Sequence, residues 1–549
     1  MDWTTLLPSL ATIWHWSYYP GLALLALTTF ITTLFLYLLI LQTIRLRPSN
    51  IPPKIPWVGL KSRWLFPKLR ACLSELSTSN GHFEEGYTHH TKHNRPFVMP
   101  WMNFNLVLLP PSCTGWVARQ PESSISATRV MDVMLGLDWM AHGPSKESVR
   151  DFGVVRRDLT RQVVNVSQEL EEEVGRCWED EMRKRGVAEE GDREWKEVKM
   201  QVLIKKIAFD AVNRIFVGVP LCRDEGYHKA VDRWLAVFGS TTLFMRFFVP
   251  VALQPWLMPV VSAPSQILYW MAKRYVKPGI ERRLEMLQAK EGKEKPNDMM
   301  QWIIDAATQK EDPRELEPAN IAGKMVLFNV FATSTTSIMS GLILFNLLSY
   351  KNAPSLLAEL SSEARQIMPT LSSDATKIRN MVKLDSVIRE TLRWAPMGGQ
   401  GLIREVVKPG GLETPDGTYL PQGTQVATII TRMQRDVEKN GNIFGEPADE
   451  YDPLRHYRAA IAAQEGGSLE EKQRIAVQIN EEFLPFGLGK HACPGRFYAV
   501  HLMKLILGYL LANYELEPFP ERPKFVEFGE SVVPDEKTAV KVRQRTTAP

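Results

Sequence analysis

Residues 483–497, FLPFGLGKHACPGRF, decide the fold of this 549-residue chain. Within them Phe486, Gly489, Cys493 and Gly495 satisfy the pattern F-x-x-G-x-x-x-C-x-G. Glycines at this spacing let the backbone pass close to a bulky group that side chains would otherwise keep away. The segment after Gly495 predicts a helix, whose N-terminal partial positive charge would face the cysteine sulfur. The pattern therefore singles out Cys493 from the other four cysteines, which form no C-x-x-C pair and are interpreted as packing residues.

Two further motifs precede the cysteine in the chain. Residues 390–393, ETLR, contain Glu390 and Arg393, which would share one face of a helix and could pair there. Residues 451–456, YDPLRH, follow and contain Arg455. With these three motifs in order, the chain resembles the cytochrome P450 family of haem-thiolate monooxygenases.

The resemblance covers roughly residues 48–530 and implies a mainly α-helical fold with a small β-sheet (α+β), in one large domain. It implies haem b as the cofactor, with Cys493 as the axial ligand of the iron. Phe486 would shield that ligand, while Gly489 and Gly495 would let the backbone approach the porphyrin. Glu390, Arg393 and Arg455 would form the buried ion-pair network behind the haem.

A run of hydroxyl residues takes the place of the family's distal motif, A/G-G-x-D/E-T. Residues 332–336 read ATSTT, so Ala332 would line the haem and Thr336 stands where the family threonine helps to protonate dioxygen. Thr335 stands where the acid is expected, which removes the usual carboxylate from the proton relay. Both threonines are candidate catalytic residues. Alternatively the hydroxyl groups, above all the Ser334 and Ser337 hydroxyls, donate to carbonyls of their own helix.

Haem propionates need cationic or hydrogen-bonding partners. By resemblance these are His491, Arg404 in the first strand after E-x-x-R, and Arg156 in the segment VVRRDLTRQV. Arg157 is the alternative to Arg156. Phe152 replaces the tryptophan that often precedes that arginine in the family, so one indole donor is lost.

The N-terminus predicts a membrane anchor. No charged residue lies between Asp2 and Arg45, and residues 21–41 would form a helix of roughly 31 Å, enough to cross a bilayer core. Basic residues after this helix favour a cytoplasmic body. A cleaved signal peptide fits less well, and a buried core helix is a third interpretation. We therefore expect an anchor at 1–47, a proline-rich linker at 48–58 and a catalytic domain at 59–549.

The remainder predicts helices with few strands. A second charge-free stretch, 325–350, is interpreted as a buried helix because hydroxyls interrupt it. Further helices are expected at 149–182, 199–216, 265–290, 298–308, 354–368 and 494–515. Strands are expected at 403–408, 418–420 and 425–431, solvated loops at 183–197 and 464–474, and a substrate-facing loop at 98–115.

The chain looks most similar to fungal microsomal members of secondary metabolism, including those related to ent-kaurene oxidase. We expect a single-pass protein of the endoplasmic reticulum that takes NADPH electrons from a cytochrome P450 reductase. It would hydroxylate or successively oxidise an apolar terpenoid or polyketide-type substrate lying against Ala332 and residues 397–402. The segment 236–262 would dip into the bilayer. A net charge of +4 gives no reason to expect nucleic-acid binding. The alternatives are a haem-thiolate isomerase or dehydratase needing no reductase, and a non-catalytic membrane haem protein.

Overall fold

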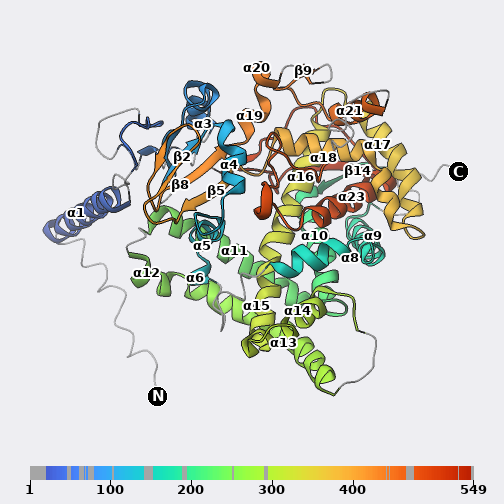
Figure 1. Ribbon diagram of the computed structural model, residues 1–549. Coiled ribbons are helices and arrows are strands. Elements are labelled where there is room, and N and C mark those ends of the chain that lie inside the picture. The colour runs from blue at the N-terminus through green and yellow to red at the C-terminus, as the bar shows by residue number, and fades with distance from the viewer. Residues whose placement is uncertain are drawn as a thin grey trace.

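The computed structural model describes most of the chain. The described residues are 20–45, 51–60, 67, 70–71, 74, 80–101, 104–140, 152–187, 194–249, 253–289, 295–440, 442–443, 446–464, 475–528 and 531–545. They form a mainly helical body with several small sheets (Figure 1). The predicted fold class is therefore confirmed, whereas the division into anchor, linker and catalytic domain stays a prediction.

The α-helices in chain order are α1 (Pro20–Arg45), α3 (Asn80–His89), α4 (Thr114–Arg119), α5 (Ala127–Leu135), α6 (Leu137–Met140), α8 (Thr160–Gln162), α9 (Ser167–Arg183), α10 (Met200–Phe216), α11 (Glu225–Phe248), α12 (Gln254–Val261), α13 (Ala263–Gln288), α14 (Met299–Thr308), α15 (Pro318–Asn329), α16 (Thr335–Leu348), α17 (Ala353–Ile367), α18 (Val382–Trp394), α19 (Thr431–Arg435), α20 (Val437–Asn440), α21 (Arg455–Gln464) and α23 (Arg496–Asn513). Two π-turns, Val155–Leu159 and Val330–Ser334, interrupt this helical order. The helices predicted from periodicity after residue 190 lie within about two residues of their observed bounds.

The strands are β1 (Phe97–Trp101), β2 (Phe104–Leu109), β3 (Ile125–Ser126), β4 (Lys196–Lys199), β5 (Gln400–Val406), β6 (Leu412–Glu413), β7 (Tyr419–Leu420), β8 (Gln425–Ile429), β9 (Asn442–Ile443), β10 (Glu446–Pro447), β11 (Tyr514–Leu516), β12 (Val526–Phe528), β13 (Ser531–Val533) and β14 (Ala539–Gln544). The largest sheet has the order β1-β2-β8-β5-β3, with β2 and β8 parallel and the other pairs antiparallel. A three-stranded sheet has the order β11-β14-β4.

Two hydrophobic cores support the body. The larger joins the helices and includes the fully buried side chains of Trp178 and Trp234. The smaller lies on the five-stranded sheet and includes Phe97 and Leu106. The helix pair α15–α16 runs through the middle of the molecule, joined by the π-turn Val330–Ser334 (Figure 1). The second apolar stretch is therefore a core helix, as its hydroxyl residues indicated.

One loop prediction is wrong and a second is wrong at one end. Residues 98–115 form the hairpin β1–β2 and the start of α4, with Val98, Leu106 and Leu108 fully buried. Strand β1 lies at the sheet edge, where its Pro100 is tolerated. In the segment 183–197, residues 184–187 form a turn and 188–193 lie outside the described residues, but strand β4 begins at Lys196 and pairs with β14. Most of the other predicted loop, 465–474, lies outside the described residues.

The N-terminal helix α1 lies at the edge of the molecule (Figure 1). Leu25, Phe30 and Ile31 are more than half exposed on it. By length and apolar composition, the described helix able to cross a membrane is the mostly buried Pro318–Leu348, while Leu25–Tyr37 is a shorter apolar segment. The Tyr37 hydroxyl donates a hydrogen bond to the Phe248 carbonyl, which fixes α1 next to the end of α11.

Candidate active site

The cysteine loop is held by backbone bonds and by glycines. The Cys493 amide donates to the Phe486 carbonyl (2.7 Å), which closes the loop into a tight turn. Gly487 and Gly489 adopt φ values of +70° and +68°, a region that favours glycine. A Cβ at Gly489 would also lie 2.8 Å from the Ala118 carbonyl oxygen on α4. The glycine is therefore needed for close contact with protein backbone as well as for its conformation.

The sulfur of Cys493 faces the start of α23. The backbone amides of Gly495 and Arg496 donate toward it, and the side chain is only partly buried. Burial raises the pKa of the Cys493 thiol, and those amides and the Arg496 charge oppose the rise. The Arg496 guanidinium is held by the carbonyls of Val477 and Cys493, each 3.1 Å away. This arrangement places hydrogen-bond donors around a sulfur, as a thiolate ligand requires.

The predicted ion-pair network is assembled. The Glu390 carboxylate accepts two hydrogen bonds from Arg393, both 2.8 Å, and one from the Arg455 Nε at 3.3 Å. The Asp452 amide donates to the same carboxylate at 3.0 Å. Glu390 and Arg455 are fully buried. Arg393 and Arg455 also bond to backbone carbonyls in the segment 434–450, so the network ties α18 to that segment and to α21.

Electrostatics in this network favour a charged carboxylate. Burial alone would raise the pKa of Glu390, but hydrogen bonds from Arg393 and His456 lower it to about 2. Burial lowers the pKa of His456 to about 4, so its ring is neutral at pH 7. Two arginines thus offset the charge of one buried carboxylate, and the neutral His456 ring lies beside it, with Nε2 3.4 Å from Glu390 Oε2.

The three predicted propionate partners come together. Arg404 is buried in β5, and its Nη1 donates to the Ile403 carbonyl at 2.8 Å. Burial, and then the charge of Arg404, lower the pKa of His491, and Arg156 contributes to the same shift. A buried guanidinium near a histidine and a second arginine could hold a dianionic group.

Glu122 is a member of this site that the sequence did not indicate. Its Oε2 lies 2.8 Å from His491 Nε2, and its Oε1 accepts bonds from the Ser126 hydroxyl and the Thr128 amide. Burial raises the pKa of Glu122, yet these bonds lower it to about 2. No motif surrounds this residue, so only the spatial contact reveals it.

Arg156 and Arg157, the alternative propionate partners, have different neighbours. Arg157 forms two hydrogen bonds with Asp158, at 2.9 and 2.8 Å. Arg156 lies in the same π-turn, and its charge acts on His491. Arg156 is therefore the better placed of the two to meet an anion beside His491.

The hydroxyl run occupies the π-turn Val330–Ser334 and the start of α16. The Thr335 hydroxyl donates to the Phe331 carbonyl, and Ser337 donates to the Ser334 carbonyl at 3.0 Å. Thr336 is 2% exposed, and within the described part of the chain its hydroxyl has no hydrogen-bond partner. Ala332 beside it is half-buried. Of the two candidate catalytic threonines, Thr336 has the hydroxyl that is available for proton transfer.

Phe152 packs against the distal π-turn. Its ring makes an edge contact with Phe331 at a centroid distance of 5.1 Å and a tilted contact with Phe328 at 5.4 Å. Because Phe152 begins the segment that carries Arg156, it links the propionate site to the distal helix. An aromatic ring is thus retained at this position, but it supplies packing and no hydrogen-bond donor.

The other described cysteines are buried: Cys113, Cys177 and Cys222. Cys177 does more than pack, since its thiol donates to Asp210 Oδ2 at 3.0 Å. Among the described residues, no three His, Cys, Asp or Glu side chains gather to hold a metal ion. Haem therefore suits the residues present: Cys493 offers one sulfur ligand, and Arg404, His491 and Arg156 offer partners for its carboxylates.

Comparison with known proteins agrees with this site. The family model described as Cytochrome P450 matches residues 138–542, well over half of the chain. The cytochrome P450 monooxygenase lnaC of Aspergillus flavus is 28% identical over 510 residues, which cover 91% of this chain and 93% of the relative. The cytochrome P450 monooxygenase polB of Polytolypa hystricis is 28% identical over 515 residues, covering 91% and 95%. The cytochrome P450 monooxygenase tenB of Beauveria bassiana is also 28% identical, covering 90% of each chain.

Proposed function

Because this chain belongs to the cytochrome P450 monooxygenases, a family of oxidoreductases, we propose that it oxidises a large apolar secondary metabolite at a membrane surface with reductase-delivered NADPH electrons. The observation that carries the proposal is the Cys493 sulfur, which faces two amide donors at the start of α23. When bound, haem supplies dioxygen activation; the protein supplies the thiolate, the propionate partners and a hydroxyl at Thr336.

The residues of this chain would divide the work. Cys493 holds the iron, and the network around Glu390 fixes the backbone behind the cysteine loop. Arg404, His491 and Arg156 orient the cofactor through its carboxylates. Thr336 holds a proton close to the distal side, while half-buried Ala332 leaves room for substrate there.

We propose that the catalytic body rests on a membrane through α1 and the end of α11. The residues Phe244, Phe248, Trp256, Leu257, Val260, Ile267 and Trp270 are all more than 40% exposed on α11, α12 and α13. The Tyr37–Phe248 hydrogen bond joins α1 to this apolar surface. Such a surface suits the lipid interface of the endoplasmic reticulum and a substrate that dissolves in lipid.

A reductase with an acidic surface would dock on a surface of opposite charge, which is a basic one. Three basic residues are exposed near the cysteine loop: Arg157, Arg161 and Lys490. Lys490 belongs to the loop itself. Arg157 and Arg161 flank Thr160, whose hydroxyl donates to the Pro494 carbonyl at 3.2 Å. Replacing Arg161 and Lys490 by glutamate should slow electron delivery from NADPH without changing haem content. Unchanged NADPH oxidation in this double variant would place the docking surface elsewhere.

The function is tested in two steps. Full-length protein in microsomes should bind carbon monoxide with a thiolate-type spectrum when reduced, and Cys493→Ala should abolish that spectrum. Deletion of the gene in its source organism should then accumulate a precursor that lacks one oxygen or carries two extra hydrogens.

Two outcomes would replace the proposal. A precursor of the same mass as the product, or heavier by one water, that is converted without NADPH would indicate an isomerase or dehydratase, a reaction that the missing carboxylate at Thr335 would permit. A normal thiolate spectrum with an unchanged metabolite profile would indicate a non-catalytic haem protein.

A further inference from the structure

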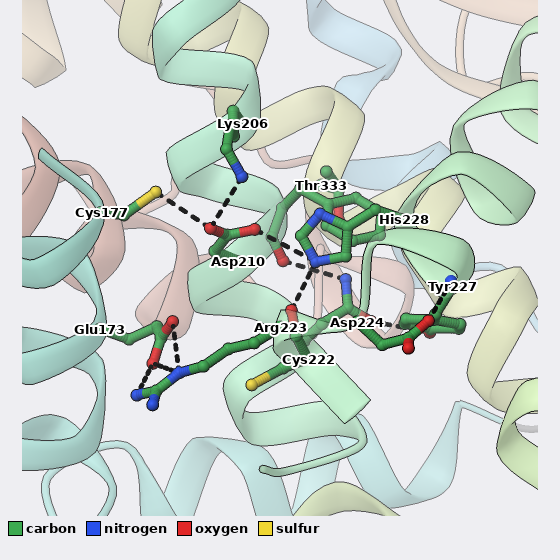
Figure 2. A network of polar contacts seen from close by, with 12 residues as sticks. Glu173, Cys177, Lys206, Asp210, Cys222, Arg223, Asp224, Tyr227, His228 and Thr333 are labelled. Carbon is green, nitrogen blue, oxygen red and sulfur yellow. Dashed lines mark hydrogen bonds and ion pairs between the residues drawn. The ribbon is translucent and has the colours of Figure 1, made fainter. Parts of the chain in front are cut away.

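A buried polar chain meets the distal π-turn from the side. The Tyr227 hydroxyl donates to Asn213 Oδ1 at 2.9 Å, and Asn213 Nδ2 donates to Asn329 Oδ1, also at 2.9 Å. The Thr333 hydroxyl donates to the same Asn329 oxygen at 3.0 Å. Figure 2 shows Tyr227 at the right of a larger polar cluster that includes Asp210 and His228, and Thr333 in its middle, next to His228. The four residues of the chain come from α10, α11, α15 and the π-turn, and each is at most 2% exposed.

Asn329 braces the π-turn on both sides. It is the residue directly before Val330, and its Nδ2 donates back to the Met325 carbonyl at 3.2 Å. Its Oδ1 accepts from Thr333, one turn ahead. One amide side chain therefore spans from the last regular turn of α15 to the end of the π-turn. Thr333 stands at the position of the glycine in the motif A/G-G-x-D/E-T, and a glycine has no side chain to make such a bond.

The brace matters because of where the π-turn lies. In a regular α-helix a threonine hydroxyl can donate to the carbonyl four residues earlier, and Thr335 bonds in this way to Phe331 in the π-turn. The next residue, Thr336, makes no such bond to Ala332 within the described residues. A π-turn inserts one extra residue and so changes the direction of the side chains that follow it, and such turns are rare unless something stabilises them. The position of the Thr336 hydroxyl therefore depends on the π-turn.

The polar chain is not a proton relay. Its two middle members are amides, and an amide N–H that gives up its proton does not regain one as a hydroxyl does. The bond directions also lead away from the helix, since Thr333 donates to Asn329. The larger cluster around Asp210 and His228 includes Cys177, Lys206 and the Cys222 carbonyl, and within the described residues no member of that cluster bonds to Thr333.

We propose that Asn329 and Thr333 are positioning residues that lock the distal π-turn and thereby hold the Thr336 hydroxyl in the position it needs for proton delivery. This inference rests on the proposed monooxygenase function for its consequence in catalysis, but its structural part stands on the hydrogen bonds alone. Asn213 and Tyr227 extend the lock to α10 and α11.

The structural part is tested by amide hydrogen exchange in haem-loaded protein. Thr333→Val keeps the shape of the side chain and removes the bond to Asn329, so the amides of residues 330–336 should exchange about tenfold faster, as expected for one lost buried hydrogen bond. Thr333→Ser keeps the hydroxyl and should restore slow exchange. Asn346→Ala serves as the matched control, because Asn346 is a buried asparagine on α16 that bonds to the Leu342 carbonyl at 2.9 Å, far along the helix from the π-turn.

The catalytic part is tested with purified reductase, NADPH and air. Unproductive turnover converts dioxygen, NADPH and a proton into hydrogen peroxide and NADP⁺. Thr333→Val should raise the peroxide released per NADPH consumed toward the value of Thr336→Val, whereas Thr333→Ser and Asn346→Ala should match the wild type. Equal exchange in Thr333→Val and wild type would overturn the lock. Faster exchange with an unchanged peroxide yield would leave a purely structural brace and overturn the positioning role. Absence of any NADPH oxidation in the wild type would instead count against the proposed function.

Discussion

The two sides of the candidate haem site are held together by different kinds of contact. Behind the cysteine loop, Glu390, Arg393 and Arg455 match the family motifs and bind one another through charged, fully buried contacts. On the distal helix, residues 330–348 contain no charged side chain, and hydroxyls and amides make the contacts instead. The first side would meet the cofactor and the second side the substrate, so the two sides face different chemical demands.

The largest effect is expected when the charged side is broken. Glu390→Gln leaves two buried arginines without their carboxylate, a loss worth about 3–5 kcal/mol in buried ion pairs. We expect little folded, haem-containing protein, measured as the carbon monoxide spectrum per unit of expressed chain. Glu438→Gln is the control, because Glu438 forms an exposed ion pair with Lys92 at 2.8 Å. A normal haem content in Glu390→Gln would contradict the role of the network.

The next effect separates chemistry from folding on the distal side. Thr336→Val preserves volume and removes the one hydroxyl of the pair that is available. We expect normal haem content and NADPH oxidation, with product per NADPH reduced by about 100-fold, the low end for loss of an acid–base group. Product and NADPH consumption can be measured together in the same reaction. Coupling equal to that of the wild type would remove Thr336 from proton delivery.

A smaller effect depends on pH and belongs to the charged side. Burial lowers the pKa of His456 and of His501 to about 4, from an ordinary value of 6.5. As the pH falls below 6.5, these two histidines become protonated in the unfolded chain but stay neutral in the folded protein. The free energy of unfolding therefore decreases between pH 6.5 and 4. The melting temperature should fall across this window and change little between pH 8 and 7. His501→Gln, which removes the contact with Ser167 as well, should reduce the slope by about half.

The smallest effect is expected at Thr335. Its hydroxyl bonds to the Phe331 carbonyl, so Thr335→Val removes a bond within the helix and no hydroxyl that is available for proton transfer. Product per NADPH should change by less than about twofold. A loss as large as that of Thr336→Val would show that the two threonines act together and that the helix bond opens during turnover.

The sequence predicts the cysteine-loop side of the site better than it predicts the distal side. The cysteine loop, the E-x-x-R pair and Arg455 are recognisable because their spacing is fixed by charged or covalent chemistry. Glu122 has no motif, and its approach to His491 depends on how α4 and β3 pass the loop. The π-turn was not predictable either, because it changes the hydrogen-bond register without changing the apolar pattern of the helix. The hairpin β1–β2 was missed since its strands are apolar on both faces and lack the alternation that marks a half-buried strand.

The position of Arg404 bears on how the protein is made. It is a cation folded into the body of the molecule, with Glu122 as the one charge that raises its pKa. His491 and Arg156 add to the positive charge of the same place at low pH. Burying such charge costs free energy of folding, and a bound dianion offsets this cost. Because a dianion that binds the folded state shifts the folding equilibrium by mass action, the folded fraction then depends on its concentration. Haem supply during synthesis should therefore limit the yield of this enzyme in a foreign host more than the rate of translation does.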